Sequence, residues 1–161
     1  MLVTHRTRRG RTRGFTLIEA MVVISILAIL AGLAAANFSS IINSSRIRAA
    51  ALDLSTDLAM ARSEAIKRNT EVTLAYGGSE WAGGWSITAS GVAAPIQVRN
   101  ALATTVSSSS TAATFVFNGS GRPATTGTVT FCPPANVSTN GRRISIDTIG
   151  LPRSESLTPC P

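Results

Sequence analysis

The sequence predicts an α+β protein in which one long N-terminal helix packs on a small, antiparallel, β-rich domain. Three observations lead to this prediction: an apolar stretch over residues 15–38, an amphipathic pattern over 39–69, and a change near residue 70 to Gly, Ser, Thr, Val and aromatic residues. The segment 70–161 is long enough to bury one modest core but not two.

Residues 1–14 have the composition of a leader rather than of a folding unit. They contain five arginines and one histidine, but no acidic residue and little apolar surface. A basic segment before an apolar one is typically retained in the cytoplasm. Loss of this leader lowers the net charge from +7 to +2, because ten of the 15 basic and all eight acidic residues remain. The high isoelectric point is therefore no evidence for nucleic-acid binding.

The stretch 15–38 is predicted to be a transmembrane helix that also serves assembly. Its 24 residues correspond to about 36 Å of helix, which spans a hydrocarbon core of about 30 Å. Glu19 stands near its start, where a carboxylate costs about 2.5–3.5 kcal/mol on insertion scales. The sequence therefore predicts a partner for this charge.

Two ordinary explanations leave Glu19 unexplained. A secretory signal would be cleaved at the small residues Ala34-Ala35-Ala36, and a signal-anchor would keep leader and helix together. A twin-arginine signal lacks the expected residues after Arg8-Arg9, and a lipoprotein signal would need a cysteine near the helix.

The residues Gly14-Phe15-Thr16-Leu17-Ile18-Glu19 closely resemble the class III signal of type IV pilins and type II secretion pseudopilins. The resemblance implies that a prepilin peptidase cleaves between Gly14 and Phe15 and methylates the new amino group of Phe15. It also implies that Glu19 pairs with that amino group on a neighbouring subunit. Such a buried pair can set the register between packed helices.

The segment 39–69 is predicted to continue the helix with one apolar face. That face is a stripe at spacings of three and four: Ile47, Ala51, Leu54, Leu58, Ala61 and Ala65. We interpret the stripe as packing against the protein's own sheet rather than as a groove for a partner.

Charged residues on the same segment are interpreted as structural. Glu64 and Arg68 form a favourable pair, whereas Asp53 and Asp57 are expected to repel each other slightly. Asn69 is the predicted end of the helix.

Six strands are predicted beyond residue 70: 71–76, 85–89, 95–98, 114–118, 128–132 and 143–147. The segments 77–84 and 107–110 are predicted to be mobile loops, and 119–123 a turn between strands. The expected core consists of the helix stripe together with Trp85, Phe115, Phe117 and Phe131.

Cys132 and Cys160 are predicted to form a disulfide, because translocation would place them in an oxidising periplasm. Such a bridge stabilises a fold by about 3–4 kcal/mol in the chain-entropy model. It would also hold the C-terminus in place.

Enzymatic function is the weakest class for this sequence. Removal of the leader removes His5, the only histidine, which excludes Ser-His and Cys-His nucleophile systems and most zinc sites. Neither a G-x-x-x-x-G-K-[ST] loop nor an H-E-x-x-H motif occurs. We therefore expect no catalytic residues, no metal and no cofactor.

Five downstream segments narrow the resemblance: residues 59–69 (AMARSEAIKRN), 72–74 (VTL), 83–85 (GGW), 131–133 (FCP) and 143–146 (RISI). They look like the GspH/FimT family of type II secretion minor pseudopilins and type IV minor pilins, over nearly the whole chain. The family implies a pilin-like fold and a place at or near the tip of a periplasmic pilus or pseudopilus.

The leading function implied by this resemblance is that of a non-enzymatic minor pseudopilin of a type II secretion system. The alternative is a FimT-like type IV minor pilin that binds DNA in natural transformation or supports pilus assembly. DNA-binding members share a C-terminal Gly-Arg-x-Arg element, which reads Gly-Leu-Pro-Arg here at residues 150–153. The candidate DNA-binding residues are therefore Arg153, with Arg142 and Arg143 nearby.

The resemblance also implies partners and location. The partners are the inner membrane, prepilin peptidase, other minor and major pilins or pseudopilins, and either secreted proteins or DNA. The chain is expected to be a single-pass protein of a bacterial inner membrane with its C-terminal domain in the periplasm, incorporated into a pilus or pseudopilus.

Overall fold

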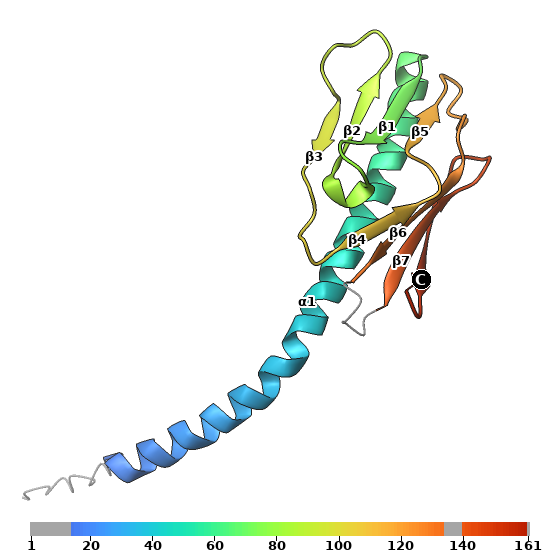
Figure 1. Ribbon diagram of the computed structural model, residues 1–161. Helices are drawn as coiled ribbons and strands as arrows, with labels where there is room; N and C mark the ends of the chain where they lie inside the picture. Colours follow the sequence, from blue (N-terminus) through green and yellow to red (C-terminus); the bar gives the residue numbers. More distant parts are fainter. Residues whose placement is uncertain (1–13, 134–139, 161) are drawn as a thin grey trace, which may run out of the picture. The chain divides into compact units, whose positions relative to one another are not determined.

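The structure, a computed structural model, describes residues 14–133 and 140–160 (Figure 1). The leader prediction therefore lies outside the described residues except for Gly14, and the side chains of residues 33–37 are also outside them. The chain divides into two compact units between Phe38 and Ser39.

A single helix, α1 (Leu17–Arg68), begins in the first unit and ends in the second. The part of α1 in the first unit is apolar, and its described large side chains are mostly exposed. Within the described part of the chain, no helix combines the length and the hydropathy that a membrane crossing requires.

The second unit contains the sheets. Its strands are β1 (Val72–Tyr76), β2 (Trp85–Ala89), β3 (Gln97–Arg99), β4 (Ser107–Ser110), β5 (Thr114–Phe117), β6 (Gly127–Cys132), β7 (Gly141–Ile146) and β8 (Pro152–Leu157), with a 3₁₀ turn, η1 (Trp81–Gly83). They form two antiparallel four-stranded sheets, ordered β3-β2-β1-β5 and β4-β6-β7-β8. Figure 1 shows both sheets lying against the C-terminal part of α1. The α+β prediction is confirmed.

The predicted core is confirmed. All six residues of the helix stripe are at most 2% exposed, and so are Trp85, Phe115, Phe117 and Phe131. These residues form one cluster with apolar side chains from both sheets, including Leu74, Ile87 and Ile144. The stripe therefore packs on the protein's own sheets, as interpreted from its periodicity.

The end of α1 follows the sequence signal. Asn69 adopts the left-handed conformation, with φ of 49°, which is the usual geometry just beyond a helix C-terminus. The Thr70 N–H donates to the Ala65 carbonyl at 3.2 Å, and the Asn69 N–H donates to the Ile66 carbonyl at 3.3 Å. The chain thus turns out of the helix within the three residues 69–71 that separate α1 from β1.

The six predicted strands are present, with ends within two residues of the expected positions. The prediction of a mobile loop at 107–110 is wrong, because these serines form β4 and pair with β6 in the register Ser108↔Phe131. The segment 77–84 connects β1 to β2 as predicted, but it is anchored by η1 and the fully buried Trp81 rather than being a loose loop. The Trp81 indole N–H donates to the Ala112 carbonyl at 3.1 Å.

The predicted turn at 119–123 is confirmed between β5 and β6. The Asn118 N–H donates to the Arg122 carbonyl at 3.0 Å, and the Gly121 N–H donates to the Asn118 carbonyl at 2.8 Å. Gly121 has φ of 76°, which explains the glycine at that position.

Asp57 is a buried structural anchor of the second unit. It is 2% exposed, and its Oδ2 accepts hydrogen bonds from the Trp85 indole N–H and from Arg99 Nε, both at 2.8 Å. Asp53 lies 3.7 Å from another nitrogen of Arg99. The hydrogen bond to Asp57 raises the pKa of the Arg99 guanidinium. The repulsion expected between Asp53 and Asp57 is therefore offset by a shared arginine.

The disulfide between Cys132 and Cys160 is present, with 5.9 Å between the two Cα atoms. It joins the end of β6 to the segment after β8. A Cβ atom added at Gly141 would collide with the Cys160 sulfur. Glycine at the start of β7 therefore makes room for the bridge.

Candidate functional site

The first candidate site is the start of α1. Gly14, Phe15 and Thr16 precede the helix, and Thr16 caps it. The Thr16 Oγ1 accepts a hydrogen bond from the Glu19 N–H at 3.3 Å, and the Thr16 carbonyl accepts one from the Ala20 N–H at 3.2 Å. A threonine followed three residues later by glutamate is the capping-box sequence. Thr16 and Glu19 of the signal motif therefore also encode the start of the helix, a local role that adds to the one the resemblance implies.

Glu19 is exposed in the first turn of α1. A negative charge there interacts favourably with the positive end of the helix dipole. Its carboxylate has no ion pair among the residues that the structure describes. The side chain thus has a local role at the helix end and a charge still available to a partner.

The surface around Glu19 is apolar. Phe15, Leu17 and Ile18 are 73%, 78% and 67% exposed. Large apolar side chains continue to be exposed along the next turns: Met21, Val22, Val23, Ile24, Ile26, Leu27, Ile29 and Leu30. A helix that is apolar on all sides is normally covered by lipid or by protein.

The second candidate site consists of Arg142, Arg143 and Arg153 near the C-terminus. These arginines lie on two different faces of the sheet. Arg142 stands opposite Phe131 and Ser156, on the face of the sheet that turns toward the core. Arg143 and Arg153 lie on the other face, because neighbouring residues of a strand alternate between faces. The three side chains therefore do not form one patch.

Acidic residues accompany the two arginines on the outer face. Arg143 stands directly opposite Glu155 in the β7–β8 register, and Arg153 Nε lies 3.9 Å from Asp147 Oδ2. Neighbouring carboxylates reduce the positive potential that a phosphate backbone would encounter.

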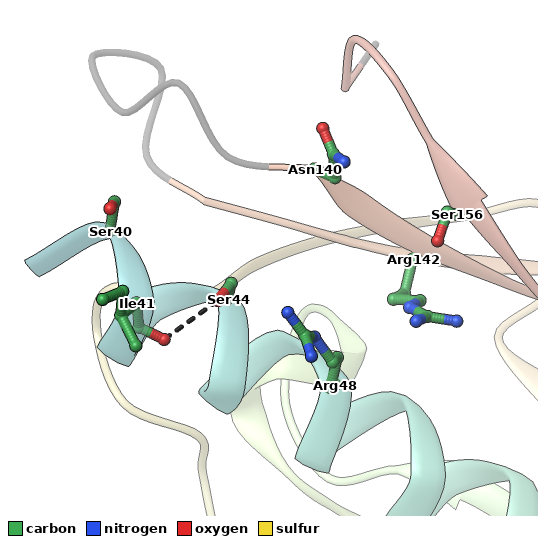
Figure 2. A pocket seen from close by; sticks show the side chains of 7 residues that line it. All are labelled: Ser40, Ile41, Ser44, Arg48, Asn140, Arg142 and Ser156. Atoms are coloured by element: carbon green, nitrogen blue, oxygen red, sulfur yellow. Dashed lines mark hydrogen bonds between the residues drawn. The ribbon is translucent and has the colours of Figure 1, made fainter. Parts of the chain in front are cut away.

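The structure instead places Arg142 close to an arginine of α1. Arg48 and Arg142 both line a cavity of about 290 Å³ between α1 and the β7–β8 pair, together with Ser40, Ile41, Ser44, Asn140 and Ser156. Figure 2 shows both arginine side chains extending into the space between helix and strands. Arg48 could not be found from the sequence, because only the packing of the sheet on the helix brings it near Arg142.

Comparisons with known proteins agree with this architecture. The sequence profile described as type II transport protein GspH matches residues 50–150, and the prokaryotic N-terminal methylation motif matches residues 9–35. No curated protein matches the chain significantly in sequence.

Solved structures of pilin-like proteins are similar to the chain. Two crystal forms of the type IV minor pilin FimU of Pseudomonas aeruginosa PAO1 match with TM-scores of 0.62 and 0.59, each at 25% identity. They cover 73% and 71% of this chain and 96% and 99% of theirs. The minor pseudopilin EpsH from the type 2 secretion system of Vibrio cholerae matches in fold, with a TM-score of 0.54 at 12% identity, covering 72% of this chain and 99% of EpsH.

The family match extends over most of the second unit, and the methylation motif covers the start of α1. Members of this family are structural, non-enzymatic subunits that assemble with other pilin-like proteins, and the motif implies processing by prepilin peptidase at the inner membrane. The chain belongs to the GspH family of type II transport proteins, the minor pseudopilins of type II secretion systems.

Proposed function

We propose that the chain is cleaved between Gly14 and Phe15, methylated on the Phe15 nitrogen, and assembled through Glu19 at or near the tip of a type II secretion pseudopilus. Before assembly, residues 15–38 anchor it in the inner membrane as a single pass, with the C-terminal domain in the periplasm. The observation that carries this proposal is Glu19, which is exposed in the first turn of a helix with many exposed apolar side chains and makes no ion pair among the residues that the structure describes.

Cleavage supplies a positive charge that can pair with the Glu19 carboxylate. It creates an ammonium group on Phe15, and N-methylation preserves its positive charge. In an apolar environment either ion alone is costly, whereas a hydrogen-bonded pair recovers much of that cost. Pairing Glu19 of one subunit with Phe15 of its neighbour therefore fixes the axial register of two apolar helices that would otherwise slide.

The second unit supplies the part of the subunit that meets other proteins. Its core is closed by Trp81, Trp85 and the aromatic residues of both sheets, and the Cys132–Cys160 bridge fastens its C-terminal segment. Such a rigid domain suits a structural role, in which neighbouring subunits and secreted proteins are the partners.

The proposal is tested by changing the charge of Glu19 while keeping its role in the helix start. Glutamine can take the place of glutamate in a capping box, so Glu19→Gln removes the charge alone, whereas Thr16→Ala removes the cap alone. We expect Glu19→Gln chains to reach the membrane and to lose residues 1–14, as measured by mass spectrometry. We expect them to be absent from isolated pseudopili.

The control variant Thr16→Ala should still be incorporated, because an N-cap is worth only about 0.5–2 kcal/mol of helix stability. Normal incorporation of Glu19→Gln would refute charge pairing. Failure of the wild-type chain to lose its leader would refute the processing step itself.

A type IV pilus subunit is the second candidate function. The observation that favours it is the likeness to FimU, a type IV minor pilin, at 25% identity over 73% of the chain. A DNA-binding version of this role would rely on Arg143 and Arg153 on the outer face, with Arg142 turned to the other side. The two machines are distinguished by deleting the gene and measuring secretion of exoproteins against pilus-dependent DNA uptake.

A further inference from the structure

The groove between α1 and the β7–β8 pair has the composition of an anion site. Arg48 contributes one guanidinium from the helix and Arg142 a second from β7, and none of the described residues that line the groove is acidic. Neither arginine takes part in an ion pair within the described ranges. Two unpaired arginines on one cavity attract an anion more strongly than either does alone.

The other lining groups suit an oxyanion. The Ser156 hydroxyl and the Asn140 amide provide further donors beside the guanidinium groups, whereas the Ser44 hydroxyl donates to the Ile41 carbonyl at 2.9 Å. Guanidinium groups bind phosphate through paired N–H donors in a planar fork. A cavity of about 290 Å³ has room for a phosphate with a small substituent.

A more apolar cavity adjoins the groove. A neighbouring cavity of about 380 Å³ shares Arg48 and Arg142 and is also lined by Ala51, Leu52 and Pro152. Leu52 is 68% exposed. A ligand that combines a phosphate with an apolar portion therefore fits better than a free anion.

The groove lies close in sequence to the proposed membrane segment, which indicates a membrane lipid as the ligand. Ser40 and Ile41 line the groove, and they follow Phe38, the last residue of the proposed membrane segment, by two and three residues. Because these residues belong to α1, three residues advance only about 4.5 Å along the helix, and the polar layer of a bilayer is about 5–7 Å deep on each side. This step depends on the proposed membrane anchoring.

We propose that this groove binds the phosphate of an anionic phospholipid headgroup through Arg48 and Arg142. A headgroup without a cation, such as phosphatidylglycerol, is preferred over phosphatidylcholine, because the choline ammonium would face two arginines. Bound lipid holds the base of the domain at the membrane surface until the subunit leaves the bilayer for the pseudopilus.

The test uses the full chain in non-ionic detergent, titrated with dioctanoyl phosphatidylglycerol or dioctanoyl phosphatidylcholine. Thermal unfolding is followed by the fluorescence of Trp81 and Trp85, both of which lie in the second unit. A ligand that binds the folded state raises the melting temperature. We expect a saturable rise with phosphatidylglycerol, and at least about tenfold weaker binding for Arg48→Gln and for Arg142→Gln.

Arg143→Gln is the matched control, because Arg143 is the next residue on β7 but lies on the opposite face of the sheet. It should bind phosphatidylglycerol like the wild type. If Arg143→Gln weakened phosphatidylglycerol binding as much as Arg48→Gln and Arg142→Gln do, the binding would depend only on the net charge of the domain. That result would overturn the proposal. A flat response of the wild-type chain would overturn it as well.

Two further ligands test the source of the phosphate. A rise of equal size with inorganic phosphate, or with phosphatidylcholine, would overturn the assignment to an anionic headgroup. Tighter binding of a short DNA duplex through the same two arginines would replace lipid by nucleic acid.

A separate measurement keeps the membrane proposal distinct from the groove proposal. If the chain fails to partition into phosphatidylcholine vesicles, membrane anchoring is wrong, and the lipid assignment loses its basis. If the chain partitions normally and Arg48→Gln binds phosphatidylglycerol like the wild type, only the groove proposal fails.

Discussion

The two parts of α1, residues 17–30 and residues 47–65, are stabilised in different ways. In residues 17–30 apolar side chains point in all directions and remain exposed within the chain. In residues 47–65 the apolar stripe from Ile47 to Ala65 is buried under the sheets, and only Leu52 and Met60 are large apolar side chains exposed outside it. The second part is therefore stabilised by its own protein, whereas the first must find its partner elsewhere, in lipid or in neighbouring subunits.

The carboxylates of the two parts differ in the same way. Asp57 is buried and accepts hydrogen bonds from Trp85 and Arg99, so its charge is satisfied within the chain. Glu19 is exposed and makes no ion pair in the described part of the chain. A charge that is satisfied internally supports a fold, whereas a charge left unsatisfied on an apolar helix is suited to assembly.

Replacing one leucine by alanine in each part of α1 should give the largest difference in the free energy of unfolding. Leu54→Ala should lower the free energy of unfolding of the second unit by about 2–5 kcal/mol, because Leu54 is fully buried and its loss leaves a cavity. Leu27→Ala should change it by less than about 0.5 kcal/mol, because Leu27 is 58% exposed.

Guanidinium-induced unfolding in detergent, followed by tryptophan fluorescence, measures both variants on one scale. Only the second unit contains tryptophan. A loss on Leu27→Ala as large as that on Leu54→Ala would break the comparison, because the first part of α1 would then contribute to the fold of the domain.

A smaller effect is expected from the two aspartates near Arg99. Asp57→Ala should cost about 2–3 kcal/mol, since it removes charge-assisted hydrogen bonds from a buried indole N–H and a guanidinium. The Arg99 side chain is 35% exposed and can turn toward water, which keeps the loss below that of a fully buried pair. Asp53→Ala is the matched control and should cost about 0–1 kcal/mol, because Asp53 is 46% exposed.

The same unfolding experiment measures Asp57→Ala and Asp53→Ala. A third variant, Asp57→Asn, separates the hydrogen bond to Trp85 from the charge. Asparagine retains an oxygen that can accept from Trp85, so its loss should fall between those of the two alanine variants. If Asp57→Ala and Asp53→Ala were equally stable, the buried network would not hold the helix to β2 and β3.

Much of this fold could be predicted from local sequence patterns. The stripe from Ile47 to Ala65 repeats at helical spacing, and its burial follows from that spacing alone. The β-prone residues 72–74 predict that the helix ends at Asn69, and Asn69 does adopt the left-handed conformation found just beyond helix C-termini. The Cys132–Cys160 bridge followed from the presence of two cysteines in a domain expected to lie in an oxidising compartment.

Features that depend on distant contacts were missed. Ser107–Ser110 has no strand propensity of its own, and it is a strand because β6 offers it a ladder of hydrogen bonds. Trp81 lies among glycines that suggest a loop, yet it is the fully buried neighbour of Trp85 and Phe115. Arg142 was grouped with Arg143 by sequence, although the alternation of side chains along β7 separates them.

The smallest change in stability is expected from the ion pairs that Glu64 makes with Arg68 and Lys67 near the end of α1. There Glu64 accepts a hydrogen bond from Arg68 Nε at 2.7 Å, and Lys67 Nζ lies 3.4 Å from its other oxygen. The hydrogen bond from Arg68 is the main reason that the pKa of Glu64 is lowered from its ordinary value of 4.5. These three charged side chains are thus paired within the helix, unlike the exposed apolar side chains of residues 17–30.

The direction of this pKa shift determines how the pair depends on pH. A lowered pKa means that folding favours the ionised carboxylate, so the stabilisation is present above pH 4.5 and is lost as the pH falls through the lower folded-state value. Glu64→Gln should therefore be slightly less stable than the wild type at pH 7, and the two should converge in acid. Arg68→Gln should show the same convergence, because it removes the other member of the pair. A difference that persists at pH 2 would mean that Glu64 acts through packing rather than through its charge, and the contrast between the two parts of α1 would then rest on apolar burial alone.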